Sequence, residues 1–192
     1  MTKLFGLAVA AILALGTQAN ASTFDAAQLQ TSTMIQAQFA AGLNWHVGDQ
    51  ADYKISIGGF INGTSHNFVS KDEGTSIWME QDMDLGFMGK QKIEVQLEKA
   101  TGKILKLLAN GQEQQVPDAG DQEVLEMHED NVTVPAGAFP CIYAKIKSKK
   151  DNSVQEAWIN PQLVPMTGIL KALADSQFGK VDQEATKFSF QK

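Results

Sequence analysis

Cysteine and arginine, on which disulfide frameworks and bidentate anion sites depend, are nearly or wholly missing from this chain of 192 residues. Cys141 is the single cysteine, so neither an intrachain disulfide nor a set of paired metal-ligand cysteines is possible. No arginine occurs, and the formal net charge is −6. Nucleic acid and anionic lipid surfaces are therefore disfavoured as partners, because their phosphates would be repelled by the chain.

Recognisable catalytic motifs are also missing. None of the runs G-x-S-x-G, H-E-x-x-H, G-x-x-x-x-G-K or G-x-G-x-x-G occurs. His46, His66 and His128 lie in separate segments, so the sequence gives them neither metal-ligand spacing nor acid–base geometry. We expect no catalytic residue, no metal and no cofactor, and predict that the protein is not an enzyme. A histidine–carboxylate pair assembled by folding inside a pocket would be the exception.

One long hydrophobic run stands at the N-terminus. Met1–Ala21 contains Lys3, an apolar stretch over Leu4–Leu15, and the small-residue site Ala19–Ala21. This order is typical of a signal peptide, and the stretch is shorter than the roughly 20 residues that a bilayer requires. We predict cleavage after Ala21, a periplasmic or secreted protein, and no stable transmembrane anchor after cleavage. A short membrane anchor is the alternative.

The segment after the signal peptide, residues 22–42, is rich in Ala and Gln and has few turn residues. Leu29, Met34, Ile35 and Phe39 recur at rough helical spacing, and Gly42 is a suitable stop. We predict a helix packed across one face or mouth of a sheet. The alternative is a partly ordered leader.

Short alternating runs separated by turn residues dominate the rest of the chain. Ile93, Val95 and Leu97 form the clearest alternation, whereas the run over 65–70 is weaker. Asn62–Gly63 and Asn110–Gly111 are pairs that favour tight hairpins. We predict one mainly β domain over residues 22–192, a single curved antiparallel sheet or half-barrel with an N-terminal helix.

A long hairpin with proline corners, Asn131–Lys171, organises this sheet. Its first arm is apolar on both faces, which requires cover on both sides. Val134–Gly137 is a sharp turn, and Pro161 and Pro165 must lie on an edge, bend or rim, because proline lacks the N–H of a sheet ladder. That rim is either a ligand mouth or partner groove, or a corner that packs its own apolar residues.

Two motifs in this hairpin carry a family resemblance. V-P-A-G-x-F-x-C at Val134–Cys141 and W-x-N-P-x-x-V-P at Trp158–Pro165 resemble a group of poorly characterised bacterial exported proteins, within or near the LolA/LolB-like curved-sheet superfamily. The resemblance covers the last third of the chain, and it implies an envelope protein with a wrapped β-sheet. Carriers of that superfamily use an arginine to bias cavity closure, and this chain has none.

Methionine and aromatic side chains are the candidates for binding, because they adapt to irregular apolar guests. The candidate ligand-binding residues are Trp78, Phe139, Tyr143, Trp158 and Met166. The same residues could instead fill an ordinary core with no cavity. Cys141 is either a small buried hydrophobic residue or a reactive thiol.

These observations favour an exported binding or carrier protein that shelters a hydrophobic ligand, a lipid or acyl group, in a curved β-sheet. The alternative is a non-enzymatic cell-envelope module that docks another protein through a sheet edge or the proline rim.

Overall fold

The computed structural model of the chain describes residues 9–10, 34–35, 43–116, 122–149, 152–176 and 178–191. The strands in the first part of the chain are β1 (Val9–Ala10), β2 (Met34–Ile35), β3 (Gln50–Ile57), β4 (Ile61–Asp72), β5 (Ser76–Asp84), β6 (Lys90–Glu98), β7 (Ile104–Ala109) and β8 (Gln112–Glu113). Those in the second part are β9 (Gln122–Val134), β10 (Gly137–Ser148), β11 (Val154–Ile159), β12 (Ile169–Ser176) and β13 (Gly179–Ser189). A 3-10 turn, η2 (Gly86–Met88), separates β5 from β6.

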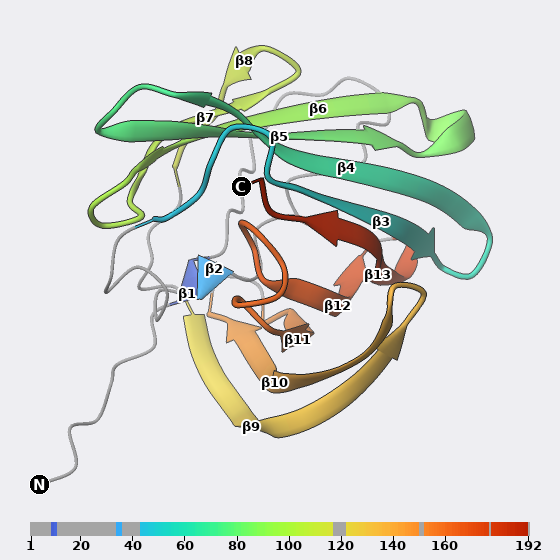
Figure 1. The fold of residues 1–192 in the computed structure, drawn as a ribbon. Helices are drawn as coiled ribbons and strands as arrows, with labels where there is room; N and C mark the ends of the chain where they lie inside the picture. The colour runs from blue at the N-terminus through green and yellow to red at the C-terminus, as the bar shows by residue number, and fades with distance from the viewer. Residues whose placement is uncertain are drawn as a thin grey trace, which may run out of the picture.

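Eleven of these strands form one antiparallel sheet in the order β8-β7-β6-β5-β4-β3-β13-β12-β11-β10-β9. Neighbours in the sheet are also neighbours in the sequence, except where β3 pairs with β13 and joins two meanders. Figure 1 shows the sheet curving, so that β4 to β7 lie opposite β9 and β10. The predicted fold, a single curved antiparallel sheet, is confirmed.

Most of the predicted helix and signal peptide lies outside the described residues. Within residues 1–42 the structure describes only β1 and β2, which pair with each other. The described part of the chain contains no helix of the length and hydropathy needed to cross a membrane.

One predicted hairpin turn is wrong. Asn62 and Gly63 lie inside β4, opposite Ser56 and Ile55 of β3. The turn is made instead by Gly58 and Gly59, whose φ angles of 60° and 78° suit glycine. Gly63 has another role, because a Cβ there would lie 2.6 Å from the carbonyl oxygen of Asp84 on β5.

The other tight-turn pair is confirmed. Asn110 and Gly111 have φ angles of 51° and 77° and connect β7 to β8. Positive φ at both positions is the geometry of a type I′ turn, whose twist matches that of the strands.

The hairpin at the centre of the sequence prediction is present. β10 pairs with β11 from Ile142 opposite Ile159 to Lys147 opposite Val154. Residues 160–168 then connect β11 to β12, and Pro161 and Pro165 lie in this connection, outside the sheet ladders. Val164 is 0% and Met166 is 2% exposed. The connection is therefore a corner that packs its own apolar residues, one of the two interpretations left open by the sequence.

Most buried side chains of the sheet gather on the face enclosed by its curvature, here called the inner face, and Ala144, Ile146, Ala157 and Ile159 form a separate, smaller cluster. Alternate residues of β3, Ala51 to Ile57, face inward, and Lys54 on the same strand faces outward. Equivalent residues of β4, β5 and β6 continue the same core across the sheet. The connection 160–168 lies within this curve (Figure 1), because its residues Val164 and Met166 belong to the core cluster.

Candidate functional site

Three polar side chains interrupt the apolar inner face on β4 and β5. Gln81 Nε2 donates to Ser65 Oγ at 2.6 Å, and Ser65 Oγ donates to Asn67 Oδ1 at 2.8 Å. Each of the three residues is no more than 4% exposed. We call Ser65, Asn67 and Gln81 the inner-face triad. A buried polar group that is not hydrogen-bonded costs free energy, so a polar group on an apolar face is expected to have a hydrogen-bond partner or a function.

The triad is surrounded by the core. Its cross-strand and diagonal neighbours on the inner face are Ala51, Tyr53, Val69, Met79, Met83 and Ile93. An apolar surface with a few convergent polar groups is the usual composition of a site for small hydrophobic molecules. The methionines add side chains that adjust to irregular shapes.

Sequence reasoning missed this triad, although a signal was present. The run over 65–70 is weak as an amphipathic strand because Ser65 and Asn67 stand where alternation calls for apolar residues. Polar residues at inward positions of a strand are the pattern that marks such a site.

Tyr53 ties the inner face to the corner 160–168. Its hydroxyl lies 3.3 Å from Thr167 Oγ1 and donates to the carbonyl oxygen of Ile169 at 3.1 Å. Burial raises the pKa of the Tyr53 hydroxyl, although the Thr167 bond lowers it slightly. The buried hydroxyl is held by protein partners and fixes the corner against β3.

The structure brings some of the five predicted ligand-binding residues together, since Phe139 and Trp158 pack against the core cluster to which Met166 belongs. Tyr143 and Trp158 are adjacent, with ring centroids 5.1 Å apart. Phe139 lies on the same strand as Tyr143 but packs against Phe188 of β13, at 5.5 Å. Met166 is in the core, on the corner. Trp78 is on β5, and β4, β3, β13 and β12 separate that strand from β11.

Tyr143 and Trp158 belong to an aromatic cluster on β9, β10 and β11. The ring of His128 lies 4.9 Å from that of Tyr143, and Trp158 Nε1 donates to Asp130 Oδ2 at 2.9 Å. Burial raises the pKa of Tyr143 to about 12, with Glu156 and other nearby carboxylates acting in the same direction. Cys141 is buried on the same strand, and burial raises the pKa of its thiol. A buried thiol with a raised pKa is unreactive, which favours the small hydrophobic role.

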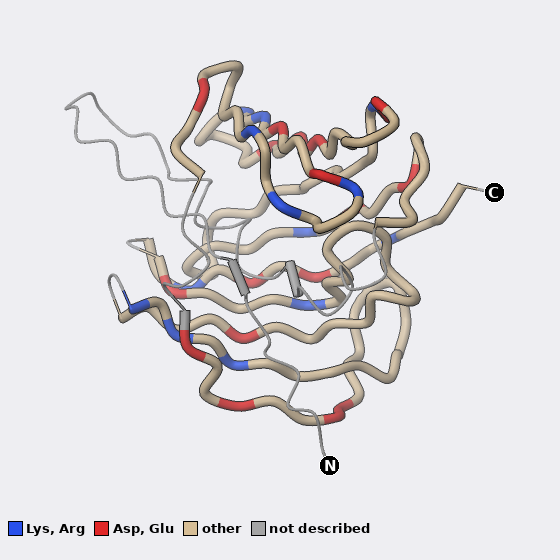
Figure 2. Tube along the Cα trace, turned by 90° about the vertical axis from the view of Figure 1, so that its left-hand side faces the viewer, with Lys and Arg blue, Asp and Glu red and all other residues tan. Residues whose placement is uncertain are grey.

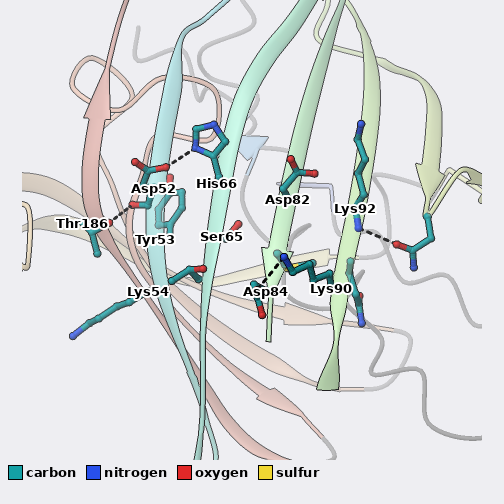
Figure 3. A pocket seen from close by; sticks show the side chains of 14 residues that line it. Asp52, Tyr53, Lys54, Ser65, His66, Asp82, Asp84, Lys90, Lys92 and Thr186 are labelled. Atoms are coloured by element: carbon teal, nitrogen blue, oxygen red, sulfur yellow. Dashed lines mark hydrogen bonds and ion pairs between the residues drawn. The ribbon is translucent and has the colours of Figure 1, made fainter. Parts of the chain in front are cut away.

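A groove of about 650 Å³ is lined by charged residues of the outer face of β3 to β6 and also by Tyr53, Ser65 and Met83 (Figure 3). His66 Nδ1 lies 2.5 Å from Asp52 Oδ1, and Asp82 stands opposite His66 on the next strand. Lys92 is bonded to Glu80 at 2.6 Å, and Lys90 lies 3.5 Å from Asp84.

The chemistry of this groove is that of a solvated face. Asp52 and His66 form a histidine–carboxylate pair, but both side chains are at least one-third exposed. Of the lining lysines, Lys54, Lys90 and Lys92 each have a carboxylate partner. Among the described residues, no group of His, Cys, Asp and Glu is arranged to hold a metal ion. The buried inner face is therefore the stronger candidate site.

Comparison with known proteins gives structural neighbours of low sequence identity. No protein-family model matches the chain, and no curated protein matches it. Similar solved structures include the hypothetical protein CT021 from Chlamydia trachomatis, with 11% identity and a TM-score of 0.48 over 77% of this chain and 89% of that one. A Bacteroides fragilis protein described as exported and of YmcC-like fold has 10% identity and a TM-score of 0.44, over 78% and 99% of the two chains. MucB has 10% identity and a TM-score of 0.45, over 82% of this chain and 58% of MucB.

Proposed function

We propose that this chain is an exported, non-enzymatic binding or carrier protein of the periplasm, which shelters a hydrophobic ligand such as a lipid or acyl chain against the inner face of its sheet. The observation that carries the proposal is the composition of that face. It is apolar across both meanders, and its polar side chains on β4 and β5 are gathered in one hydrogen-bonded triad. The Met1–Ala21 signal pattern supports the location.

The energetics of such binding are favourable for a single acyl chain. Each buried methylene contributes about 0.8 kcal/mol, so about ten of them contribute roughly 8 kcal/mol before the cost of association. A gross free energy of about 8 kcal/mol corresponds to a dissociation constant near 1 μM. Because association itself costs free energy, the dissociation constant for such a chain should be no smaller than this. A carrier needs binding that is reversible, and this range provides it.

The test is native mass spectrometry of the protein purified from its own host, combined with titration of a fluorescent fatty acid. We expect a co-purified hydrophobic molecule and saturable uptake of the probe. Met79→Trp, which adds bulk to the inner face beside the triad, should weaken uptake at least tenfold. Asp84→Asn changes the outer face of the same strand and is the matched control.

Because Met79→Trp can also disturb folding, its urea unfolding curve is measured beside that of Met79→Ala. Met79→Ala should keep or increase uptake, since it removes bulk. Absence of both a co-purified molecule and saturable uptake in the wild-type protein would overturn the proposal.

The edge strand β9 favours a second candidate function, docking of another envelope protein. β9 ends the sheet and is 13 residues long. Over residues 125–129 both of its faces are exposed, and Leu125 and Met127 are 46% and 48% exposed. An edge of this kind offers unpaired backbone groups to an added strand.

The charge on β9 defines the partner. The strand contains Glu123, Glu126, Glu129 and Asp130 and no lysine, and Figure 2 shows acidic residues without basic ones along this lowest strand. Two copies of β9 would repel each other, whereas an extended segment that alternates basic and apolar residues would be complementary.

Synthetic peptides distinguish this candidate from the carrier. An alternating Lys-Val peptide should protect β9 amides from hydrogen exchange, and a Glu-Val peptide of equal length should not. Met127→Pro, which removes one N–H of β9, should abolish the protection, and fatty-acid uptake should be unchanged. Equal protection by both peptides, or by neither, would contradict the docking function.

A further inference from the structure

Three hairpin turns at one end of the sheet carry phenylalanines. Phe60 lies in the turn between β3 and β4, Phe87 in η2 between β5 and β6, and Phe178 in the turn between β12 and β13. Phe60 and Phe87 are 65% and 83% exposed, the two largest values among the large apolar side chains that the structure describes. Phe178 is half-buried and packs against the core. Surface turns are usually built from small and polar residues, so exposed aromatic rings on neighbouring turns indicate an interaction surface.

Close backbone contacts hold the three turns beside one another. A Cβ at Gly58 would lie 2.5 Å from both the Phe178 carbonyl oxygen and the Phe60 ring, so glycine is required there for the two turns to approach. On the other side, a Cβ at Gly86 would lie 3.6 Å from the carbonyl oxygen of Asn62, two residues after Phe60. The β3–β4 turn therefore lies between the other two, and Figure 1 shows the β3–β4 and β5–β6 hairpins ending on the same side of the sheet.

We infer that these turns dock on the surface of a lipid bilayer with neutral or zwitterionic head groups, into which Phe60 and Phe87 insert. The residues of this surface, here called the phenylalanine tips, are 58–60, 85–89 and 178–179. The inference goes beyond the proposed carrier function and requires no bound ligand. Insertion removes apolar surface from water, and its strength depends on the apolar area buried and not on a complementary shape.

The charges around the phenylalanine tips favour this type of membrane. The tips contain no charged residue, whereas the chain as a whole has a formal net charge of −6. The charged residues that directly adjoin the tips in the sequence are Asp84, Lys90 and Lys180, and Lys90 lies 3.5 Å from Asp84. Two lysines and one paired carboxylate do not repel a lipid phosphate at this end of the sheet. The net negative charge of the chain still disfavours a strongly anionic membrane, which leaves a zwitterionic one.

A protein partner is the competing occupant, and the size of the surface argues against it. A stable protein interface buries about 800 Å² on each partner. An aromatic side chain buries about 150 to 250 Å², so two exposed rings fall well short of that area. The same two rings are sufficient for reversible contact with a bilayer.

The experiment measures binding of the full mature protein to phosphatidylcholine vesicles by co-sedimentation. We expect saturable binding that added salt does not weaken, because apolar insertion is not screened. Phe60→Ser and Phe87→Ser should each weaken binding about tenfold, and the double variant about a hundredfold. Phe190→Ser is the matched control, because Phe190 is 42% exposed but follows the other end of β13, and it should bind as wild type does.

A second measurement reports insertion directly. Phe87→Trp places an indole on the β5–β6 tip, and Phe190→Trp places one at the opposite end of the sheet. Vesicles whose lipids carry bromine on the acyl chains should quench the added fluorescence of Phe87→Trp and leave that of Phe190→Trp unchanged. Equal quenching of the two variants, or none, would contradict insertion of the tips.

The remaining outcomes separate this inference from its alternatives. Wild-type protein that does not bind the vesicles would overturn it and leave a protein partner as the occupant. Binding that survives in the double serine variant, or that requires anionic lipid and is lost in salt, would also overturn it. Urea unfolding of the serine variants checks folding. Fatty-acid uptake in solution should be unchanged in the double variant, so absence of uptake by wild-type protein would overturn the carrier function and not the docking.

Discussion

The two meanders of the sheet differ in how their buried residues are arranged. In the first, β3 to β8, buried and exposed residues alternate regularly, as on β6, where Ile93, Val95 and Leu97 are buried. In the second, β9 to β13, β10 buries both Tyr143 and Ala144 in succession, and Ala144, Ile146, Ala157 and Ile159 form a core cluster of their own. Bulges bend strands and change the direction of side chains. Bulges interrupt the register in both meanders, at Val69/Lys71 and Gln96/Leu97 in the first and at Lys145/Ile146 and Trp158/Ile159 in the second. The separate core cluster, and not the presence of bulges, therefore sets the second meander apart.

The meanders meet at β3 and β13, where a few side chains link them. Glu184 of β13 bonds to Lys54 of β3 at 2.7 Å and to Lys171 of β12 at 2.6 Å. The turn between β9 and β10 reaches the same place, because the N–H of Ala136 donates to the carbonyl oxygen of Ala185. Substitutions at this junction test whether the two meanders form one cooperative unit.

The largest effect is expected from Tyr53→Ala. Tyr53 is 1% exposed and joins β3 to the corner 160–168. Loss of the ring should lower the free energy of unfolding by about 3 to 5 kcal/mol, as for other buried aromatics. Tyr53→Phe keeps the ring and should cost about 1 to 2 kcal/mol, since it removes the buried hydrogen bond to the Ile169 carbonyl.

Urea unfolding followed by far-UV and near-UV circular dichroism provides the measurement. Both signals should change together in both variants, because the junction couples the meanders. Two separate transitions in Tyr53→Ala would show that the meanders unfold independently and would contradict the coupling.

A smaller effect is expected at Met166, where the glycine variant should be more stable than the alanine variant. This residue is 2% exposed and has a φ of 63°, in the left-handed region that glycine tolerates best. Met166→Ala should cost about 2 to 5 kcal/mol for the lost side chain. Met166→Gly should be more stable than Met166→Ala by about 1 kcal/mol, because it removes the strain of a Cβ at positive φ.

Val164 supplies the control for this reversal. It is equally buried, but its φ lies outside the left-handed region, so Val164→Gly should be less stable than Val164→Ala. The measurement is thermal or urea unfolding of all four variants. The same order of Gly and Ala at both positions would show that the backbone at Met166 is unstrained.

Glu184→Gln should have a moderate effect that depends on pH. Burial raises the pKa of the Glu184 carboxyl, but the bonds and charges of Lys171 and Lys54 outweigh burial and hold the pKa below its usual 4.5. A group whose pKa is depressed by folding stabilises the protein above its unfolded pKa, and this stability is lost as pH falls through the folded value.

At pH 7 we expect Glu184→Gln to lose about 1 to 2 kcal/mol of unfolding free energy. The difference from wild type should shrink once the pH falls below 4.5. Unfolding curves at a series of pH values provide the measurement, and Asp84→Asn is the control, because its side chain is 48% exposed and its bond to Lys90 is 3.5 Å long. A loss independent of pH would mean that the Glu184 charge has no part in the junction.

Much of the first meander could be predicted from the sequence. The alternation at Ile93 to Leu97 and the Asn110–Gly111 turn follow from side-chain direction and local φ preference alone. The turn predicted at Asn62–Gly63 was wrong because these two residues lie inside a strand, where they have a different structural role. Gly58 and Gly59 had already supplied the turn, and Gly63 is small because Asp84 of the neighbouring strand approaches it closely. That approach is a tertiary contact, which no local pattern contains.

The candidate site was less accessible to prediction for the same reason. Tyr143 and Trp158 could be paired in advance, since they lie opposite each other in one hairpin. Gln81 reaches Ser65 and Asn67 only through the pairing of β4 with β5, and the partners of Tyr53 lie 114 and 116 positions further along the chain. Contacts within a hairpin follow from sequence spacing, whereas contacts across the curved sheet follow from its closure.

The last prediction concerns ionisation of the tyrosines, which should leave the stability at neutral pH unchanged. The chain has two, one at the junction and one in the second meander, and burial raises the pKa of both, that of Tyr143 to about 12. Native protein should therefore show little tyrosinate absorbance at pH 10 to 11, whereas unfolded protein should show it around pH 10. Because folding favours the neutral form of each tyrosine, this contribution to stability is complete below pH 10, and it is lost as the pH rises through the pKa values of the folded protein.

Tyr143→Phe leaves Tyr53 as the single reporter, which should ionise only when the junction opens. Tyrosinate absorbance at pH 10 in folded Tyr143→Phe would show that the Tyr53 hydroxyl is reached by solvent and that the corner 160–168 does not seal the inner face.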